Sequence, residues 1–180
     1  MNFISRFASV LVGSSLIFAP TVRADEVWNQ HVKLWNALGD VGISVLINDP
    51  QFCVGGRDGS YYSRRRMLIV CQDNASKMSS REVKWTDNDL DTLRHESHHV
   101  VQDCVDGELG DNQLDNYFSE HDQYLDFVVT ALTEEQVESI VEWYEGASDK
   151  VITNEIEAFA VAKSVDADTI ADVLLKVCSS

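Results

Sequence analysis

Proline and basic residues are scarce in this sequence. Its 180 residues include two prolines, and 14 lysines and arginines stand against 30 aspartates and glutamates, for a net charge of −16. A surface this acidic repels nucleic-acid phosphates and anionic membranes, so neither is an expected partner. Only Pro50 lies beyond residue 24, and neither a proline-rich linker nor an internal repeat divides the chain. The sequence predicts one domain with a sizeable core over residues 25–180.

The sequence also lacks an apolar run long enough to span a bilayer. The longest run covers residues 7–19, whereas a transmembrane helix needs about 20 residues. Arg6 precedes this run, and small or aliphatic residues occupy the −3 and −1 positions before a cleavage site after Ala24. We expect residues 1–24 to be a signal peptide, with an uncleaved membrane anchor as the alternative. Cleavage removes two arginines and no acidic residue, which leaves a chain of net charge −18. We expect this chain to be secreted or periplasmic and to have no stable association with a membrane.

No two cysteines are spaced as Cys-x-x-Cys, which argues against cysteine ligation of a metal. All four cysteines, at positions 53, 71, 104 and 178, follow the predicted signal peptide. An even number in an exported chain predicts two disulfides, for which three pairings exist. We favour Cys53–Cys71 and Cys104–Cys178, a pairing whose second bond ties the predicted central helix to the C-terminal helix.

Residues 92–102, Thr-Leu-Arg-His-Glu-Ser-His-His-Val-Val-Gln, contain the pattern His-Glu-x-x-His. Residues four apart lie on one face of an α-helix, so His95 and His99 can offer two imidazole nitrogens to one ion. Glu96 lies beside that ion, where its carboxylate could hold and deprotonate a bound water. This combination is the signature of zinc hydrolases. The alternative interpretation is a polar helix face with incidental histidines.

Signals at both ends predict one helix over residues 87–104 that carries this motif. Thr86 and Asp89 are close to a capping box, with aspartate in place of the usual glutamate. Gly107 is a natural stop after the last apolar positions. The motif then lies in the middle of the helix, where the backbone holds side chains most rigidly.

The rest of the chain predicts short strands followed by helices. β-branched runs indicate two strands, over residues 41–47 and 67–71, that can pair antiparallel on either side of a turn-rich excursion over residues 51–62. Helical periodicity and capping residues predict further helices over residues 25–38 (ended by Gly39), 117–132, 134–145 (opened by the capping box Thr133 to Gln136), 150–164 and 168–177. The fold class is α+β: an N-terminal helix and short antiparallel strands, then a helical bundle that carries the His-Glu-x-x-His helix.

Two histidines do not complete a catalytic zinc site, which usually has three protein ligands and one open position. His121 is the only histidine after His99, and its spacing suits neither common downstream arrangement. Glu155 is better placed, because its predicted helix is apolar on the same side and a carboxylate aimed there is costly unless it meets a cation. Small alanines in that helix would also allow a close approach to the motif helix.

His-Glu-x-x-His-Val-Val-Gln, followed about fifty residues later by Glu-x-Glu-Ala, resembles the gluzincin branch of zinc metallopeptidases in small single-domain form. The resemblance covers the two motifs and the strand–helix–helix order. It implies a zincin-like fold over residues 25–180 and one Zn²⁺ held by His95, His99 and Glu155. It also implies that Glu96 is the general base.

The second motif leaves an alternative third ligand. Glu157 is the fallback, because this chain has Phe159 where many members of the branch have aspartate or asparagine four residues after the ligand glutamate. That departure removes a usual hydrogen-bonding partner of the site. The ligand set of two histidines and one glutamate also suits divalent ions other than zinc.

The implied activity is hydrolysis of peptide bonds in a peptide or protein substrate by a monomer. The candidates for stabilising the oxyanion are Tyr144, Tyr124 and His98. By analogy with the branch, the strand over residues 67–71 would be the edge against which an extended substrate pairs. The competing class is a non-catalytic binding protein with a structural metal, closed by a fourth ligand such as His98 or Glu157.

Three further positions have open interpretations. His98 lies near the ligand face, and a partly exposed position on the helix edge is favoured over a contact with the site. Gln102 could accept a hydrogen bond from a ligand imidazole or donate one to it. The cluster Arg64-Arg65-Arg66 is favoured as a solvated strand end, with a subsite for an acidic group as the alternative.

Overall fold

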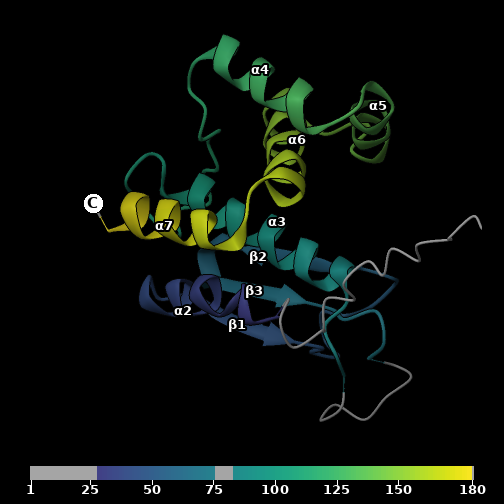
Figure 1. Cartoon of the computed structure of the whole chain (residues 1–180), viewed down its shortest axis with the longest axis vertical. Helices are drawn as coiled ribbons and strands as arrows, with labels where there is room; N and C mark the ends of the chain where they lie inside the picture. The colour runs from purple at the N-terminus through teal and green to yellow at the C-terminus, as the bar shows by residue number, and fades with distance from the viewer. Residues whose placement is uncertain (1–27, 76–82, 180) are drawn as a thin grey trace, which may run out of the picture.

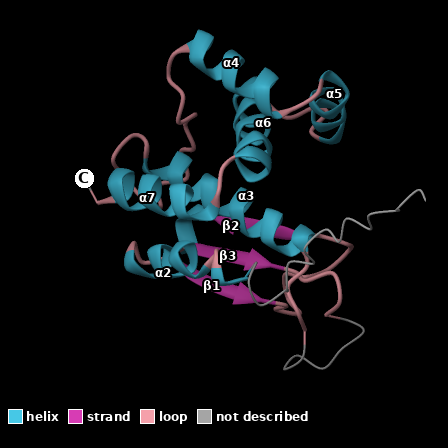
Figure 2. Cartoon of the chain, viewed as in Figure 1, coloured by secondary structure: helices cyan, strands magenta, loops and turns pink. Residues whose placement is uncertain are grey.

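A computed structural model describes residues 28–75 and 83–179. In these residues six α-helices and a small three-stranded sheet form the mixed α+β fold expected from the sequence (Figure 1). The first part contains α2 (Val32–Asp40), β1 (Ser44–Ile47), β2 (Gly59–Tyr62), the 3-10 turn η1 (Ser63–Arg65) and β3 (Met67–Val70). The second part contains α3 (Asp87–Cys104), α4 (His121–Ala131), α5 (Glu134–Trp143), α6 (Asp149–Ser164) and α7 (Ala167–Cys178). Figure 2 shows the strands together below α3 and the later helices above them.

The predicted signal peptide, residues 1–24, lies outside the described residues. Within the described ranges, each helix is too short or too polar to cross a bilayer.

The sheet differs from the predicted antiparallel pair. β1 and β3 are parallel, from Ser44 opposite Met67 to Ile47 opposite Val70, so the predicted pairing is wrong. The reason is a third strand, β2, inside the segment predicted as turns. β2 pairs antiparallel with β3 across η1, and the chain therefore reverses once more before β3 begins.

The strand order β1-β3-β2 also corrects the predicted substrate edge. β3 lies in the centre with both sides paired, so residues 67–71 cannot be the edge against which a substrate pairs. The edge strand beside α3 is β2 instead. Gly59 and Ser60 are weak strand formers that follow a turn-type aspartate, and they form a strand here because β3 and α3 cover them.

The central helix, α3, has the predicted bounds. Thr86 accepts a hydrogen bond from the backbone N–H of Asp89 at 3.1 Å, and the Asp89 carboxylate accepts one from the backbone N–H of Thr86 at 2.8 Å. This is the complete capping box. After Cys104 the chain turns away at Gly107, whose φ of +92° lies in the left-handed region.

Several other helix ends differ from prediction. In the helix predicted over residues 25–38, α2 begins at Val32 and continues through Gly39 to Asp40, and the left-handed position, with φ of +84°, is Gly42. α5 ends at Trp143 rather than Glu145. α4 begins at His121 rather than Tyr117. The backbone N–H groups of Tyr117 and Phe118 donate to the carboxylate of Glu157, which holds this segment outside the helix.

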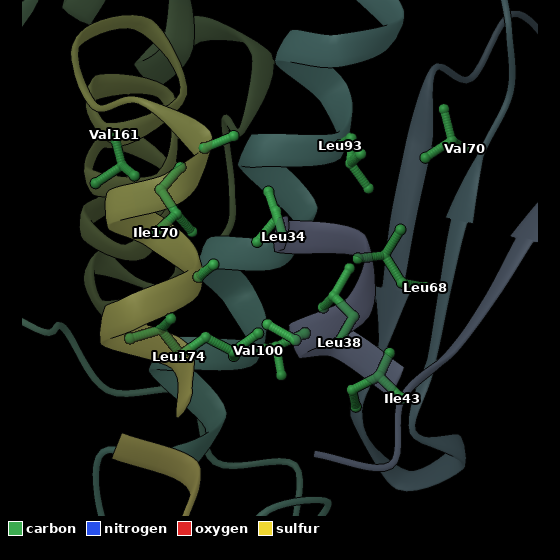
Figure 3. Packing of buried hydrophobic residues seen from close by; sticks show 14 residues of the cluster. Leu34, Leu38, Ile43, Leu68, Val70, Leu93, Val100, Val161, Ile170 and Leu174 are labelled. Atoms are coloured by element: carbon green, nitrogen blue, oxygen red, sulfur yellow. The ribbon is translucent and has the colours of Figure 1, made fainter. Parts of the chain in front are cut away.

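The protein has two groups of buried apolar side chains, one on each side of the contact between α3 and α6. The larger one joins α2, the sheet, α3 and α7, and Figure 3 shows Leu34, Leu68, Leu93 and Leu174 packed in it. The smaller one joins α4, α5 and α6. Because α3 and α6 pack directly against each other between these two cores, side chains at their crossing are held by both (Figure 1).

Both predicted disulfides are present. Cys53 bonds Cys71, and Cys104, at the end of α3, bonds Cys178, at the end of α7. The first links the segment after β1 to the end of β3. Two disulfides indicate an extracellular or otherwise oxidising compartment.

Candidate metal centre

The crossing of α3 and α6 brings His95, His99 and Glu155 together. His95 Nε2 lies 3.1 Å from His99 Nε2 and 3.3 Å from Glu155 Oε2. His99 Nε2 lies 3.5 Å from Glu155 Oε1. The two histidines are buried, at 9% and 6% exposed, and the glutamate is mostly covered. These three residues form a group that could hold one metal ion.

The donor atoms fit a shared cation better than they fit one another. Two imidazole nitrogens 3.1 Å apart can share at most one proton. Glu155 Oε2 lies close to His95 but has no hydrogen-bond geometry with it or with another described group. One ligand atom from each of the three residues lies within 4.8 Å of the others, close enough for the three to share one metal ion.

The charges around the site differ between the two histidines. Burial lowers the pKa of His95 to about 4. Burial also acts to lower the pKa of His99, but the hydrogen bond and charge of Glu155 outweigh it and raise that pKa to about 9. Despite its own burial, the Glu155 carboxylate has a pKa far below its usual range, because it faces both imidazoles. The site therefore favours one positive charge beside Glu155.

Glu96 lies next to this group, under the start of β2. Its side chain is 7% exposed, and burial raises its pKa to about 7, opposed by the charge of His99 and by a hydrogen bond from the backbone N–H of Tyr61. A Cβ atom at Gly59 would lie 2.5 Å from Thr92 Cγ2 and 3.0 Å from Glu96 Oε1. The missing side chain of Gly59 is what allows β2 to approach α3 here.

A cleft of about 840 Å³ opens over His95 and Glu96. One wall is the start of β2 with Arg57, and another comes from the end of α4 together with α5 and α6. The apolar part of that second wall is Leu132, Ile140, Trp143 and Phe159. Trp143 is 79% exposed, which is unusual for so large an apolar side chain.

The three predicted oxyanion donors occupy different places. Tyr144 lines the cleft, and its burial and the nearby Glu155 carboxylate raise the pKa of its hydroxyl above the usual range. The Tyr124 hydroxyl donates to the backbone carbonyl of Thr153 at 3.2 Å. His98 is 3% exposed and points away from the cleft, so the favoured partly exposed position was wrong.

Glu157 occupies a fully buried position behind the site. Gln102 Nε2 and the backbone N–H of Phe118 donate to its carboxylate at 2.7 Å and 2.9 Å, and His98 Nε2 lies 3.2 Å away. Its side chain is 0% exposed. Its pKa is lowered although burial acts to raise it, because these groups favour the charged form. The structure therefore groups Glu155, and not Glu157, with the two histidines.

Phe159, four residues after Glu155 on α6, packs against His95. Its ring centroid lies 4.4 Å from that of His95. The Nδ1 atom of His95 is buried and has no hydrogen-bond partner among the described residues. Packing against an aromatic ring, rather than a hydrogen bond, holds this imidazole.

Of the remaining residues singled out in the sequence, Gln102 contacts the site and the arginine cluster does not. Gln102 contacts His99, as the sequence predicted. Arg64, Arg65 and Arg66 are exposed and lie at the far end of β2 from the cleft, and Arg66 donates to the carbonyl of Leu109 at 2.9 Å. None of the three lines the cleft.

Sequence reasoning missed the roles of Gly59 and Trp143. Gly59 lies in the segment interpreted as turns, and it serves close packing instead. Trp143 lies within the helix predicted over residues 134–145 and was given no role there. Its position at the end of that helix, next to Tyr144, was the available signal.

In comparisons with models of protein families, with curated proteins and with solved structures, this chain has no match.

Proposed function

We propose that this protein is an exported zinc-dependent peptidase. The observation that carries the proposal is the grouping of His95, His99 and Glu155 beside Glu96, where His95 and Glu96 line the cleft. Ligand atoms about 2.05 Å from a tetrahedral zinc ion lie about 3.3 Å apart, from the bond lengths of such sites. Here the two imidazole nitrogens lie 3.1 Å apart, and Glu155 presents Oε2 to His95 at 3.3 Å and Oε1 to His99 at 3.5 Å. One ligand atom from each of the three residues lies within 4.8 Å of the others.

The chain's own groups would divide the reaction among them. A bound zinc ion supplies a Lewis acid and lowers the pKa of water towards neutrality. Glu96 takes a proton from the attacking water and returns it to the leaving amine. Tyr144, on the cleft wall, can donate to the carbonyl oxygen as negative charge develops there. β2 is an edge strand of the sheet, and an extended peptide can pair with the backbone groups of its outer edge other than the Tyr61 N–H, which is bonded to Glu96.

The alternative function, a binding protein with a closed structural metal site, lacks a fourth ligand in the described residues. Its two candidates, His98 and Glu157, lie beside each other and outside the group of three. Three protein ligands next to a cleft are typical of a catalytic site, whereas structural zinc sites usually have four. The arrangement supports the peptidase.

Elemental analysis of the purified protein tests the metal site. We expect about one zinc per chain in the wild type, and its loss in His95→Ala and in Glu155→Ala. His121→Ala and Glu142→Gln are matched controls, because both residues are exposed and lie outside the site. A wild type without metal after reconstitution, or zinc retained in both site variants, would contradict the proposal.

Peptide cleavage tests the activity separately. Glu96→Gln keeps the size of the side chain but cannot accept the proton, so we expect turnover to fall at least a hundredfold with zinc content unchanged. A library of unstructured peptides read by mass spectrometry supplies the substrate. If zinc-loaded wild type cleaves nothing, or if Glu96→Gln cleaves as fast as the wild type, the peptidase assignment fails.

A further inference from the structure

The amide of Gln102 has only one orientation that satisfies its neighbours. Its Nε2 atom lies 2.7 Å from Glu157 Oε2 and 3.0 Å from the backbone oxygen of Asn154, and both of these oxygens can only accept hydrogen bonds. The amide nitrogen must face them. Oε1 therefore faces His99 Nδ1, at 2.7 Å. Gln102 is 0% exposed, so no water competes for these contacts.

This orientation determines which nitrogen of His99 carries a proton. An amide oxygen can only accept, so Nδ1 must be the donor. The neutral ring then has its lone pair on Nε2, the atom that lies 3.1 Å from His95 Nε2 and 3.5 Å from Glu155 Oε1. That tautomer is the one a metal at this position needs.

Glu157 cannot rotate away from Gln102. Besides Gln102, Oε2 accepts from Asn116 Nδ2 at 3.2 Å and from the backbone N–H of Tyr117 at 3.1 Å. Oε1 accepts from the backbone N–H of Phe118 at 2.9 Å. These hydrogen bonds fix the carboxylate of Glu157, and they also fix the position of the segment between α3 and α4.

We propose that Glu157 and Gln102 are positioning residues for His99, which keep its Nε2 lone pair directed at the site. The inference rests on the proposed zinc site. Both residues lie outside the cleft, so they act on the metal through His99 and do not touch substrate. Glu157, the alternative third ligand, takes this different role, and the hydrogen-bonded chain from Glu157 to His99 supplies the orientation that Phe159 cannot supply to His95.

Zinc affinity, measured by competition with a chelating dye, tests the proposal without any activity assay. Gln102→Met keeps the volume but removes all three hydrogen bonds of the side chain. We expect a Kd about 10- to 100-fold higher, the usual effect of losing a partner of a ligand histidine. Glu157→Gln is nearly isosteric and places an amide where the carboxylate was. It should raise the Kd about tenfold, and it covers the case in which Gln102→Met does not fold.

Asp103→Asn is the matched control. Asp103 follows Gln102 on α3, is also 0% exposed, and accepts from Tyr61 and Ser63 at 2.8 Å and 2.7 Å without contacting His99. We expect lower stability and a zinc Kd within about threefold of wild type. In zinc-loaded wild type, NMR should detect an exchange-protected Nδ1 proton on His99, and this signal should disappear in Gln102→Met only.

Three results would overturn the proposal. The first is a folded Gln102→Met or Glu157→Gln that binds zinc as tightly as wild type. The second is an equal loss of affinity in Asp103→Asn, since any buried polar contact of α3 would then suffice. The third is a wild type that binds no zinc, which overturns the proposed function as well. The first two leave the zinc site standing, so the two failures are distinguishable.

Discussion

The two histidines of α3 that face Glu155 are held by different means, one at the cleft and one on the buried side of the site. On the cleft side, His95 packs against Phe159, and its Nδ1 atom has no hydrogen-bond partner in the described part of the chain. On the buried side, His99 is hydrogen-bonded to Gln102, which is bonded in turn to Glu157. The imidazole of His95 is held by packing, and that of His99 by hydrogen bonds. The cleft side can therefore tolerate more change than the buried side.

Each side has its own disulfide, and removing them gives the largest expected effect. Cys104–Cys178 closes 74 residues on the buried side, and Cys53–Cys71 closes 18 residues behind the cleft edge. In the chain-entropy model, their loss costs about 4.4 and about 3.2 kcal/mol of unfolding free energy. Chemical denaturation of the two double-serine variants measures the difference. A larger loss of unfolding free energy in Cys53→Ser/Cys71→Ser than in Cys104→Ser/Cys178→Ser would contradict the expectation that the buried side is the more constrained one.

Truncating the buried carboxylate should cost more than truncating the ring on the cleft side. Glu157→Ala leaves Gln102 and the backbone N–H groups of Tyr117 and Phe118 without their acceptor, and we expect a loss of about 3 kcal/mol. Phe159→Ala removes a partly buried ring and should cost about 1.5 kcal/mol. Urea unfolding of metal-free protein compares them. Equal losses would show that the two sides are equally constrained.

Adding one methyl group at Gly59 should prevent the close approach of β2 to α3. Gly59→Ala puts a methyl group 2.5 Å from Thr92 Cγ2, and relieving this overlap should cost about 2 kcal/mol and displace β2 from Glu96. Thr92→Ser removes that methyl group and should restore part of the loss in the double variant. A double-mutant cycle measures the coupling. If the losses of unfolding free energy in the two single variants simply add in the double variant, the contact between β2 and Thr92 does not limit their approach.

The smallest expected effect is a gain. Phe159→Asp offers the buried Nδ1 of His95 an acceptor, and we expect zinc affinity to rise about tenfold, or about 1.4 kcal/mol, although the lost ring lowers stability. Dye competition measures the affinity, with Phe159→Asn and Phe159→Ala as controls for charge and for lost packing. Unchanged or weaker binding would mean that packing alone positions His95 as well as a hydrogen bond would.

Local rules predicted most of the elements. The capping box at Thr86 and Asp89 and the stop near Gly107 gave α3 its bounds, because caps act over a single turn. Failures came where a distant residue intervened. Glu157 binds the backbone of Tyr117 and Phe118, so α4 starts four residues later than its apolar pattern indicates. The position of β2 was missed because its strand character comes from its neighbours.

The sequence by itself determined the helix that carries His95, Glu96 and His99, because its caps act locally and helical spacing puts the two histidines on one face, one turn apart, with Glu96 beside them. It did not determine which acidic residue of α6 lies against them. Glu155 and Glu157 share a helix and differ little in local preference. The crossing of α3 and α6, held by the packing of two separate cores, turned one carboxylate to the histidines and buried the other in a polar network.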